Sequence, residues 1–205
     1  MQELSLNILD IAENSVRAGA ALVRVAVRAF PAEDMLRIAI EDDGSGMDEE
    51  TAKGAADPFY TTRTTRKVGL GLPYLKMNAE LTGGAMEIAS SPGRGTRVEA
   101  TFGLGHIDRA PLGDMGQTMS LLAGANPEMD FVYELCVCAD TGDSADSGGI
   151  AGAADSADGS GGFVFDTREV KQVLDGVPIS EPEVMAYMAS HINENTKELI
   201  TAYNI

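Results

Sequence analysis

Three short segments of the chain carry side chains whose types and spacing could bind a phosphorylated ligand. They are LDIAENSVRAGA at 9–20, EDDGSGM at 41–47 and TTRTTRKVGLGLP at 61–73. The first offers a carboxylate, an amide and a guanidinium group, and the second offers a carboxylate before two glycines. The third is a basic run that leads into a glycine turn. In this order they supply what a magnesium nucleotide needs, namely oxygen ligands, a base-recognising carboxylate and phosphate donors.

The first segment is predicted to form a helix over residues 4–18, because its apolar residues recur at helical spacing. Asp10, Asn14 and Arg17 follow one another at helical intervals, so they lie along one polar edge of that helix. Magnesium prefers oxygen ligands and usually keeps waters while it bridges phosphates. The Asn14 carbonyl suits this ion without adding negative charge, and Arg17 could pair with a phosphate.

The second segment ends a predicted strand. VRVAVRAF and the following MLRIAIED alternate apolar and polar residues, which predicts two adjacent antiparallel strands. A carboxylate at the strand end, Asp42, could accept a hydrogen bond from an exocyclic amine such as that of adenine. Gly44 and Gly46 permit a turn with positive φ and a close approach of the backbone to a flat ring. The alternative is an ordinary Asp-Gly turn.

The third segment predicts a basic loop that opens onto a helix. Residues 58–68 show neither a helical nor a strand period, and the glycine turn that follows leads through Pro73 into an apolar helix ending near Leu81. The free N–H groups of a helix N-terminus attract phosphate. Arg63, Arg66 and Lys67 could close over a polyphosphate from the loop. The alternative is a simple loop-to-helix cap without a ligand.

Taken in order, these residues resemble the GHKL superfamily of gyrases, Hsp-type chaperones, histidine kinases and mismatch-repair proteins. LDIAENSVRAGA resembles its N box, DDGSGM its G1 box and VGLGL its G2 box, and GGAMEIASSPGRGTRVEATF resembles its paired closing strands. The resemblance covers residues 4–103. It implies an α/β fold of the Bergerat type, a two-layer α/β sandwich in which a mixed sheet lies under helices.

The resemblance also implies that ATP and Mg²⁺ are the ligands. Asn14 matches the magnesium-binding asparagine, Asp42 the aspartate that reads the adenine amine, and Thr96 the threonine near the adenine. The full set of residues that it places at the nucleotide is Asn14, Arg17, Asp42, Gly44, Gly46, Met47, Arg63, Lys67, Gly69, Leu70, Gly71, Leu72 and Thr96.

Asp10 is the candidate catalytic residue, since it stands where ATP-hydrolysing and serine-kinase members of the superfamily carry a glutamate base. Aspartate is one methylene shorter, so it could need a water to reach the proton that it removes. Glu13 is a second carboxylate on the same helix, but adjacent helix residues diverge by about 100°. A solvated role fits Glu13 better. Lys67 replaces a glycine that many histidine kinases carry at the start of the G2 box.

The resemblance favours a kinase that phosphorylates a partner protein in bacterial signal transduction, in the manner of anti-sigma serine kinases. Two alternatives stay open, a nucleotide-gated protein-binding module and a slow ATPase. No helix pair with a phosphorylated histidine precedes the N box, so a self-contained histidine kinase is not expected. The two histidines, His106 and His191, fit junction and packing or surface roles better than phosphoacceptor roles.

Composition restricts the class of partner. The chain of 205 residues has a formal net charge of −17. Residues 1–105 hold 11 basic and 15 acidic residues, a net of −4, whereas residues 106–205 hold 4 and 17, a net of −13. This balance argues against nucleic acid and anionic membranes as partners. The absence of an apolar run of membrane-spanning length and of a leader pattern, together with the use of ATP, predicts a cytoplasmic protein.

Residues 106–205 are predicted to form a small acidic α+β accessory domain beside an ATP-binding domain at 1–105. Helices are expected at 114–125 and 180–203, and MDFVYELCVC and GGFVFDTREV are expected to pair as strands. Residues 140–162 hold five aspartates, seven glycines and no basic residue, which predicts a disordered loop rather than a calcium site.

The accessory domain is expected to dock a protein partner. The overall pattern resembles small stand-alone GHKL proteins of anaerobic bacteria, some encoded beside iron hydrogenase and redox genes, so a regulator or a redox-enzyme component is the expected class. A homodimer is compatible with the sequence. Cys136 and Cys138 have the wrong spacing for a C-x-x-C site and should face the same side of a strand. Buried packing is favoured for them, and a redox or cluster-contact role is the alternative.

Overall fold

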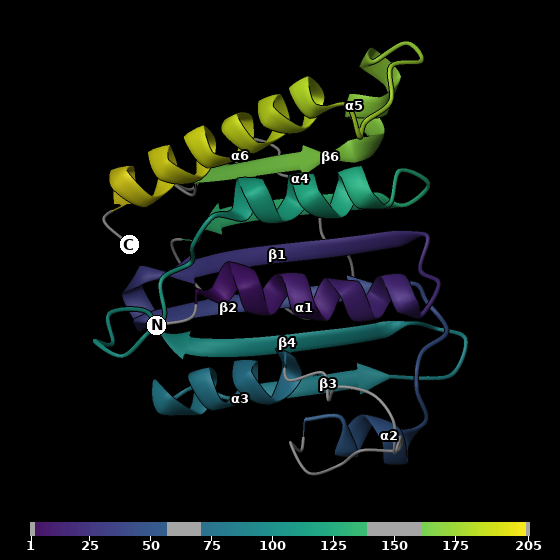
Figure 1. Cartoon of the computed structure of the whole chain (residues 1–205). Coiled ribbons are helices and arrows are strands. Elements are labelled where there is room, and N and C mark those ends of the chain that lie inside the picture. Colours follow the sequence, from purple (N-terminus) through teal and green to yellow (C-terminus); the bar gives the residue numbers. More distant parts are fainter. Residues whose placement is uncertain (1–2, 57–70, 139–160, 204–205) are drawn as a thin grey trace.

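The computed structural model describes residues 3–56, 71–138 and 161–203, which share one six-stranded sheet (Figure 1). In chain order the strands are β1 (Leu22–Phe30), β2 (Met35–Asp42), β3 (Met86–Ser90), β4 (Thr96–Gly103), β5 (Asp130–Val137) and β6 (Gly161–Asp166). Their order across the sheet is β3-β4-β2-β1-β5-β6. Strands β1 and β5 are parallel and all other neighbours are antiparallel, so the predicted mixed sheet is confirmed.

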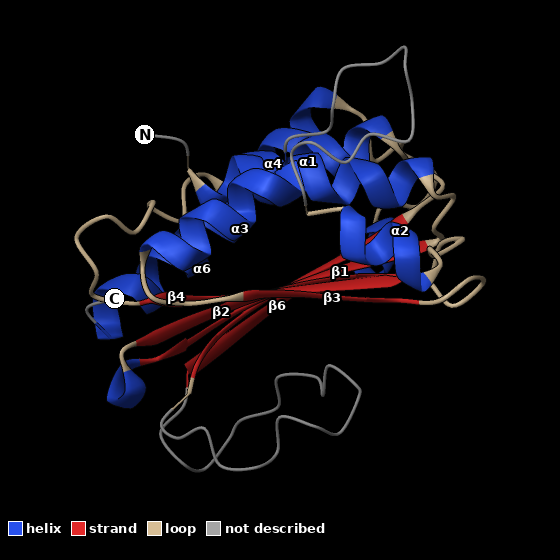
Figure 2. Cartoon of the chain, turned by 90° about the horizontal axis from the view of Figure 1, so that it is seen from below, coloured by secondary structure: helices blue, strands red, loops and turns tan. Residues whose placement is uncertain are grey.

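Helices form the second layer. They are α1 (Leu4–Arg17), α2 (Glu49–Gly54), α3 (Gly71–Leu81), α4 (Met115–Ala125), α5 (Thr167–Val173) and α6 (Pro182–Tyr203), with a short 3₁₀ turn η1 (Pro31–Glu33) between β1 and β2. Figure 2 shows α1, α3, α4 and α6 on the same face of the sheet. The two-layer α/β architecture is therefore as the sequence predicts.

The alternating pattern of β1 and β2 explains which face the helices cover. Val25 pairs with Ile40 and Val27 with Ile38, and all four side chains are buried in the core. Each buried aliphatic side chain of this size contributes about 1.5–3 kcal/mol to folding. The intervening residues of both strands point to the opposite face, as the two-residue period of a strand requires.

Helix α1 packs on this sheet through one apolar stripe. Leu4, Ile8, Ile11 and Ala12 are all buried, and their spacing of three or four residues places them on one side of the helix. Asp10, on the other side, is exposed. The helix predicted over residues 4–18 is confirmed to within one residue, and its polar edge is left outside the core.

Helix α3 confirms the predicted helix after the glycine turn. It begins at Gly71, has Pro73 in its first turn, and buries Leu75 and Ala79. The basic loop predicted at 58–68 falls within residues 57–70, which lie outside the described residues.

Residues 106–205 extend the same sheet. Strand β5 runs parallel to β1, and β6 pairs with β5, so the two predicted strands do pair. The expected helices are present as α4 and α6. They pack closely at Gly116, where an added Cβ would come within 2.2 Å of the Ala189 carbonyl oxygen. The predicted boundary at residue 105 follows β4, and the division into two domains stays a prediction.

The predicted end of the low-complexity loop at residue 162 is wrong by two residues. Gly161 and Gly162 belong to β6, where they pair with Val137 and Cys136. The remaining part, up to residue 160, lies outside the described residues. Among the described helices, none has both the length and the hydropathy that a membrane crossing requires.

The two cysteines face the same side of the chain, as their spacing predicts. The Sγ atoms of Cys136 and Cys138 are 3.1 Å apart, and both side chains are half-buried. Contact with the neighbouring thiol and burial both raise the pKa of Cys136 far above that of an ordinary thiol. A thiol with a raised pKa is a poor nucleophile, so this environment favours packing over redox chemistry.

Candidate functional site

A pocket of about 490 Å³ opens between α1, the end of β2 and the start of β4. Its volume is within the range of about 300–1,000 Å³ that small-molecule sites usually have. Seven residues predicted to bind nucleotide line it, namely Asn14, Arg17, Asp42, Gly46, Met47, Leu72 and Thr96. Four more predicted residues, Arg63, Lys67, Gly69 and Leu70, lie outside the described residues.

Asp42 is held in one orientation at the end of β2. Its Oδ1 accepts a hydrogen bond from the Gly44 N–H at 2.9 Å, and its Oδ2 accepts one from the Ser15 hydroxyl at 2.7 Å. A carboxylate has about four acceptor positions, so two remain after these contacts. The arrangement leaves a fixed acceptor in the pocket for an external donor such as an exocyclic amine.

The register of three adjacent strands brings Thr96 beside Asp42. Asp42 pairs with Thr96 across β2 and β4, and Thr96 pairs with Ser90 across β4 and β3. The Ser90 hydroxyl lies 2.9 Å from the Thr96 hydroxyl and also accepts the Met47 N–H at 2.8 Å. Because the ends of these strands are aligned, the segment at residues 42–47 contacts the segment at residues 90–96, about fifty residues later in the sequence.

Two glycines permit the close approach of these segments. Gly46 has φ +64°, and a Cβ there would come within 2.0 Å of the Ser91 carbonyl oxygen. Gly95 has φ +80°, and a Cβ there would come within 1.8 Å of the Asp42 carbonyl oxygen. Both positions therefore require glycine for conformation and for space. Gly46 is among the predicted site residues, whereas Gly95 is not.

Ser15 is a site residue that the sequence reading missed. It is 3% exposed and lies on the apolar side of α1, four residues after Ile11. A hydroxyl on a buried helix face needs a hydrogen-bond partner, since leaving it unpaired costs about 1–3 kcal/mol. A polar residue within the apolar stripe was the available signal, and its partner proves to be Asp42.

Asn14 and Arg17 form the exposed wall of the pocket on α1. The Arg17 Nε donates to the Glu13 carbonyl oxygen at 3.0 Å, and its guanidinium is 3.5 Å from the Glu13 carboxylate. Both side chains of this pair are more than half exposed, and such surface pairs contribute only about 0–1 kcal/mol. Breaking the Arg17–Glu13 pair therefore costs little free energy, so the Arg17 guanidinium can bind a phosphate instead.

Asp10 does not line the pocket but lies at the junction of α1 and α3. A Cβ placed on Gly71 would come within 2.7 Å of the Asp10 Cβ and 3.6 Å of its Oδ2. The missing side chain at Gly71 thus lets the start of α3 approach Asp10. The structure brings the candidate base to the helix end that follows the predicted phosphate loop.

Gly44 lies just behind the pocket, against α1. A Cβ there would be 2.9 Å from the Ala18 Cβ and 3.0 Å from Oδ1 of Asp42. Larger residues at this position would push the turn away from α1. The turn and the helix are also joined by the Ser45 N–H, which donates to the Ala18 carbonyl oxygen at 3.0 Å.

Helix α2 closes one side of the pocket through Thr51 and Ala55. Its N-cap residue, Asp48, accepts the Thr51 N–H at 2.7 Å. Hydrogen bonds from Thr51 lower the pKa of the Asp48 carboxyl, so it stays ionised as a cap. This contact stabilises the first turn of α2, which carries Thr51.

The pocket fits a nucleotide in the chemistry of its walls. Apolar side chains from β2, β4 and α3 offer contact area for a flat ring, and they are Ile40, Val98 and Leu72. The fixed acceptor at Asp42 lies among them, and the amide and guanidinium of α1 lie at the exposed side. Ile40 and Val98 were not predicted as site residues, because buried strand residues are ordinarily core.

Comparison with protein families gives one match over the first half of the chain. The model of the histidine kinase-, DNA gyrase B- and HSP90-like ATPases matches residues 1–106. These residues contain all of α1 to β4 and every residue that lines the pocket. The resemblance that the sequence motifs indicate is thereby confirmed.

Individual relatives match the same part of the chain. The sensor protein kinase FleS of Pseudomonas aeruginosa is 39% identical over 105 residues, which are 51% of this chain and 25% of the relative. The non-motile and phage-resistance protein of Caulobacter vibrioides is 33% identical over 115 residues, 53% of this chain and 14% of the relative. The sensor histidine kinase YxdK of Bacillus subtilis is 30% identical over 104 residues, 48% of this chain and 32% of the relative. The chain thus spans less than a third of the length of each relative.

Proposed function

The chain belongs to the family of histidine kinase-, DNA gyrase B- and HSP90-like ATPases, and we propose that it transfers phosphate from ATP to a partner protein. It contains an ATP-binding, kinase-like ATPase domain. The proposal adds the acceptor to that statement, a serine or threonine hydroxyl of a regulatory partner, as in anti-sigma kinases. A cytoplasmic location is part of the same proposal, since ATP is available there.

The place of Asp10 is the observation that carries this proposal. Its carboxylate is exposed on α1, one helical turn before Asn14, and it lies against Gly71 at the start of α3. A base for phosphoryl transfer must lie beside the phosphates and remain open to a second substrate. Asp10 is open to a second substrate. With adenine at Asp42, we expect the phosphates of the nucleotide to extend along the exposed edge of α1 towards Asp10.

The reaction is a direct transfer. The hydroxyl oxygen of the partner forms a bond to the γ-phosphorus of ATP, the bond from that phosphorus to the β–γ bridging oxygen breaks, and ADP leaves with the electron pair. Asp10 accepts the hydroxyl proton, directly or through one water. A positioned general base typically contributes about 10²–10⁴-fold to a rate.

Magnesium fits the same edge through Asn14. Its side chain is exposed and lines the pocket, and its carbonyl oxygen is a suitable ligand for an ion that keeps waters and phosphate oxygens as its other ligands. When bound, the ion would neutralise negative charge on the phosphate oxygens. Arg17, one turn further along, would pair with phosphate once it leaves Glu13.

A nucleotide-gated binding module is the second candidate, and one observation favours it. Asp10 lies outside the lining of the described pocket, so the pocket itself does not place it beside a γ-phosphate. In this case ATP would alter partner binding without useful turnover. A slow ATPase is the remaining alternative, in which water takes the place of the partner hydroxyl.

The test follows ATP labelled at the γ-phosphate, with magnesium, with and without cell extract. The wild type, Asp10→Asn and Glu13→Gln are compared, since Glu13 is a carboxylate on the same helix that is also exposed. We expect label on a partner protein with the wild type and with Glu13→Gln. Asp10→Asn should reduce the transfer rate by about 10²-fold or more while nucleotide affinity is kept.

Each other outcome selects a different function. Transfer that is equally fast with Asp10→Asn would contradict the role of Asp10 as a base. Nucleotide-dependent binding of a partner without label would indicate the gated module. Release of labelled phosphate in the absence of extract would indicate an ATPase.

A further inference from the structure

A second hollow of about 460 Å³ lies between β6, α5 and α6, and it is called the β6–α6 groove below. It lies at the β6 end of the strand order, and β1 and β5 separate it from β2 and β4, which line the nucleotide pocket. Figure 1 shows this order of the strands. Apolar side chains make most of its lining, and they are Val164, Phe165, Val170, Val173, Leu174, Val184 and Tyr187.

Several of these apolar side chains are exposed to water. Val173 is 84% exposed, Tyr187 is 68% exposed and Val164 is 37% exposed. Single exposed apolar residues are ordinary on a protein surface, but a cluster around one hollow marks an interaction site. Covering side chains of this size gains about 25 cal/mol for each Å² of apolar surface removed from water.

Tyr187 is held in an orientation suited to contact. Its ring stacks on the His191 ring with an interplanar angle of 2° and centroids 6.0 Å apart. The His191 ring also contacts the Phe163 ring in an edge-to-face arrangement, with centroids 5.5 Å apart and an interplanar angle of 70°. Tyr187 and His191 both line the groove, so these stacked rings form an aromatic part of its wall.

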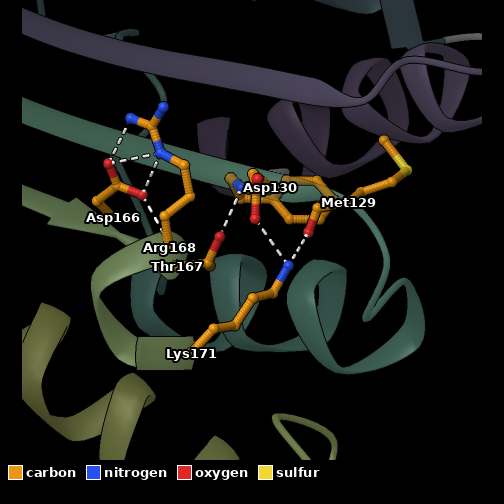
Figure 3. Close-up of polar contacts among 7 residues, drawn as sticks. Met129, Asp130, Asp166, Thr167, Arg168 and Lys171 are labelled. Atoms are coloured by element: carbon orange, nitrogen blue, oxygen red, sulfur yellow. Dashed lines mark hydrogen bonds and ion pairs between the residues drawn. The ribbon is translucent and has the colours of Figure 1, made fainter. Parts of the chain in front are cut away.

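Three carboxylates line the groove, and of these only Asp166 forms an ion pair with another described residue. Figure 3 shows where the two cations of α5 are used instead. Arg168 binds the Asp166 carboxylate, with Nε 2.9 Å from Oδ1, and Lys171 binds Asp130 at 2.7 Å and the Met129 carbonyl oxygen at 2.6 Å.

Glu169 and Glu183 remain on the rim without such partners. Both are exposed, and neither forms an ion pair with another described residue. No lysine or arginine is found among the described residues that line the groove. An apolar hollow with unpaired carboxylates at its rim is complementary to an apolar segment that carries positive charge.

One side of β6 is also open to pairing. Within the described part of the chain, β6 pairs with β5 alone and is the last strand of the sheet. A free strand edge can accept an extended peptide by main-chain hydrogen bonds, while a neighbouring pocket selects its side chains.

We propose that the β6–α6 groove binds a segment of a partner protein that combines branched or aromatic apolar residues with lysine or arginine. A second copy of this chain is a poorer occupant, because a two-fold contact through the groove would place Glu169 and Glu183 of both copies together. Residues 139–160 are poorer still, since they contain no basic residue and Ile150 is their one large apolar residue.

The proposal does not depend on the proposed kinase function. The groove shares no lining residue with the nucleotide pocket. Asn14→Ala is therefore expected to leave binding in the groove unchanged, so a failure of one proposal can be told from a failure of the other.

The test uses a random peptide library displayed on phage, with the full chain as bait and the Val173→Asp variant for counter-selection. We expect enriched peptides to carry leucine, isoleucine, valine or phenylalanine next to lysine or arginine. The affinity of one enriched peptide, labelled with fluorescein, is then measured by fluorescence anisotropy.

Matched variants separate the groove from general charge attraction. Val173→Asp should weaken the affinity for the peptide by about tenfold or more. Val177 is an exposed valine outside the groove, and Val177→Asp should change that affinity by less than about twofold. Glu169→Lys with Glu183→Lys should likewise weaken binding far more than Glu33→Lys with Glu198→Lys, two exposed positions that do not line the groove.

Three results would overturn the proposal. They are enrichment of peptides without a basic residue, equal losses in the Val173 and Val177 variants, and equal losses in the two charge-reversal pairs. A concentration-dependent dimer in sedimentation that Val173→Asp dissociates would also overturn it, because the occupant would then be a second copy.

Discussion

Replacing Asp42 with asparagine changes one acceptor of the pocket into a donor and leaves the size of the side chain unchanged. The Gly44 N–H needs an oxygen at the Oδ1 position, so the amide nitrogen of asparagine takes the Oδ2 position. The Ser15 hydroxyl, now 2.7 Å from Oδ2, can turn and accept instead of donating. The fold should therefore tolerate Asp42→Asn, and the substitution should change the affinity for the nucleotide.

The size of that effect follows from the contact that is lost. A hydrogen bond to a charged acceptor contributes about 1.5–3 kcal/mol, and a tenfold change in affinity corresponds to about 1.4 kcal/mol. Asp42→Asn should therefore weaken binding of a non-hydrolysable ATP analogue by about 10- to 100-fold. The corresponding inosine nucleotide carries an oxygen in place of the adenine amine, so its affinity should fall less or rise.

Isothermal titration calorimetry with both nucleotides measures these affinities, and Asp43→Asn is the matched control. Asp43 is exposed and does not line the pocket, and its Oδ1 accepts the N–H groups of Ala21 and Leu22 at 2.7 and 2.9 Å. The control removes the same charge and keeps an oxygen acceptor. If Asp42→Asn stays within about threefold of the wild type, or if Asp43→Asn loses as much, the role of Asp42 in recognising the base is wrong.

Three further perturbations test other parts of the structure. Asn14→Ala should abolish the magnesium dependence of nucleotide affinity, measured by calorimetry with and without a chelator. Because the Asn14 side chain is exposed, the free energy of unfolding should change by less than about 0.5 kcal/mol. Gly95→Ala should cost about 3 kcal/mol or more in urea unfolding, since its Cβ would meet a backbone oxygen at 1.8 Å, whereas Gly93→Ala, with φ +74° and open space, should cost about 1 kcal/mol. Burial opposes ionisation of Asp166, but hydrogen bonds from Arg168 outweigh it and lower its pKa, so the native state binds fewer protons there than the unfolded state. Asp166→Asn should therefore lower the Tm at neutral pH, and the difference should shrink as the pH falls below the ordinary value of 3.8 and through the lowered pKa.

The first half of the fold could be predicted because its signals are local. The alternation in β1 and β2, the apolar stripe of α1 and the glycine before α3 each depend on neighbours a few residues apart. The parallel pairing of β5 with β1 is different in kind. It joins Val25 to Tyr133, more than a hundred residues later, and no periodicity encodes which distant strand a strand will meet.

The residues of the site also fall into those with a local sequence signal and those without one. Asn14 and Asp42 could be predicted because motif and chemistry agree at each position. Ser15 and Gly95 could not, because their roles depend on contacts between segments: the Ser15 hydroxyl meets β2, and Gly95 leaves space for the Asp42 carbonyl. Asp10 is intermediate, since its residue type indicates a base but its distance from the pocket is set by the packing of α1 on α3.

The helix that carries Asn14 and Asp10 depends on residues beyond the family domain. Glu3, at its N-cap position, provides no side-chain hydrogen bond to the free N–H groups of the first turn. The N–H groups of Leu4 and Ser5 instead donate to the carbonyl oxygens of Pro111 and Leu112, at 2.9 and 2.8 Å. Unpaired N–H groups at a buried helix end are costly, so this distant segment completes a helix that the first half begins. Residues 111 and 112 thus contribute to the stability of the helix that carries Asn14 and Asp10.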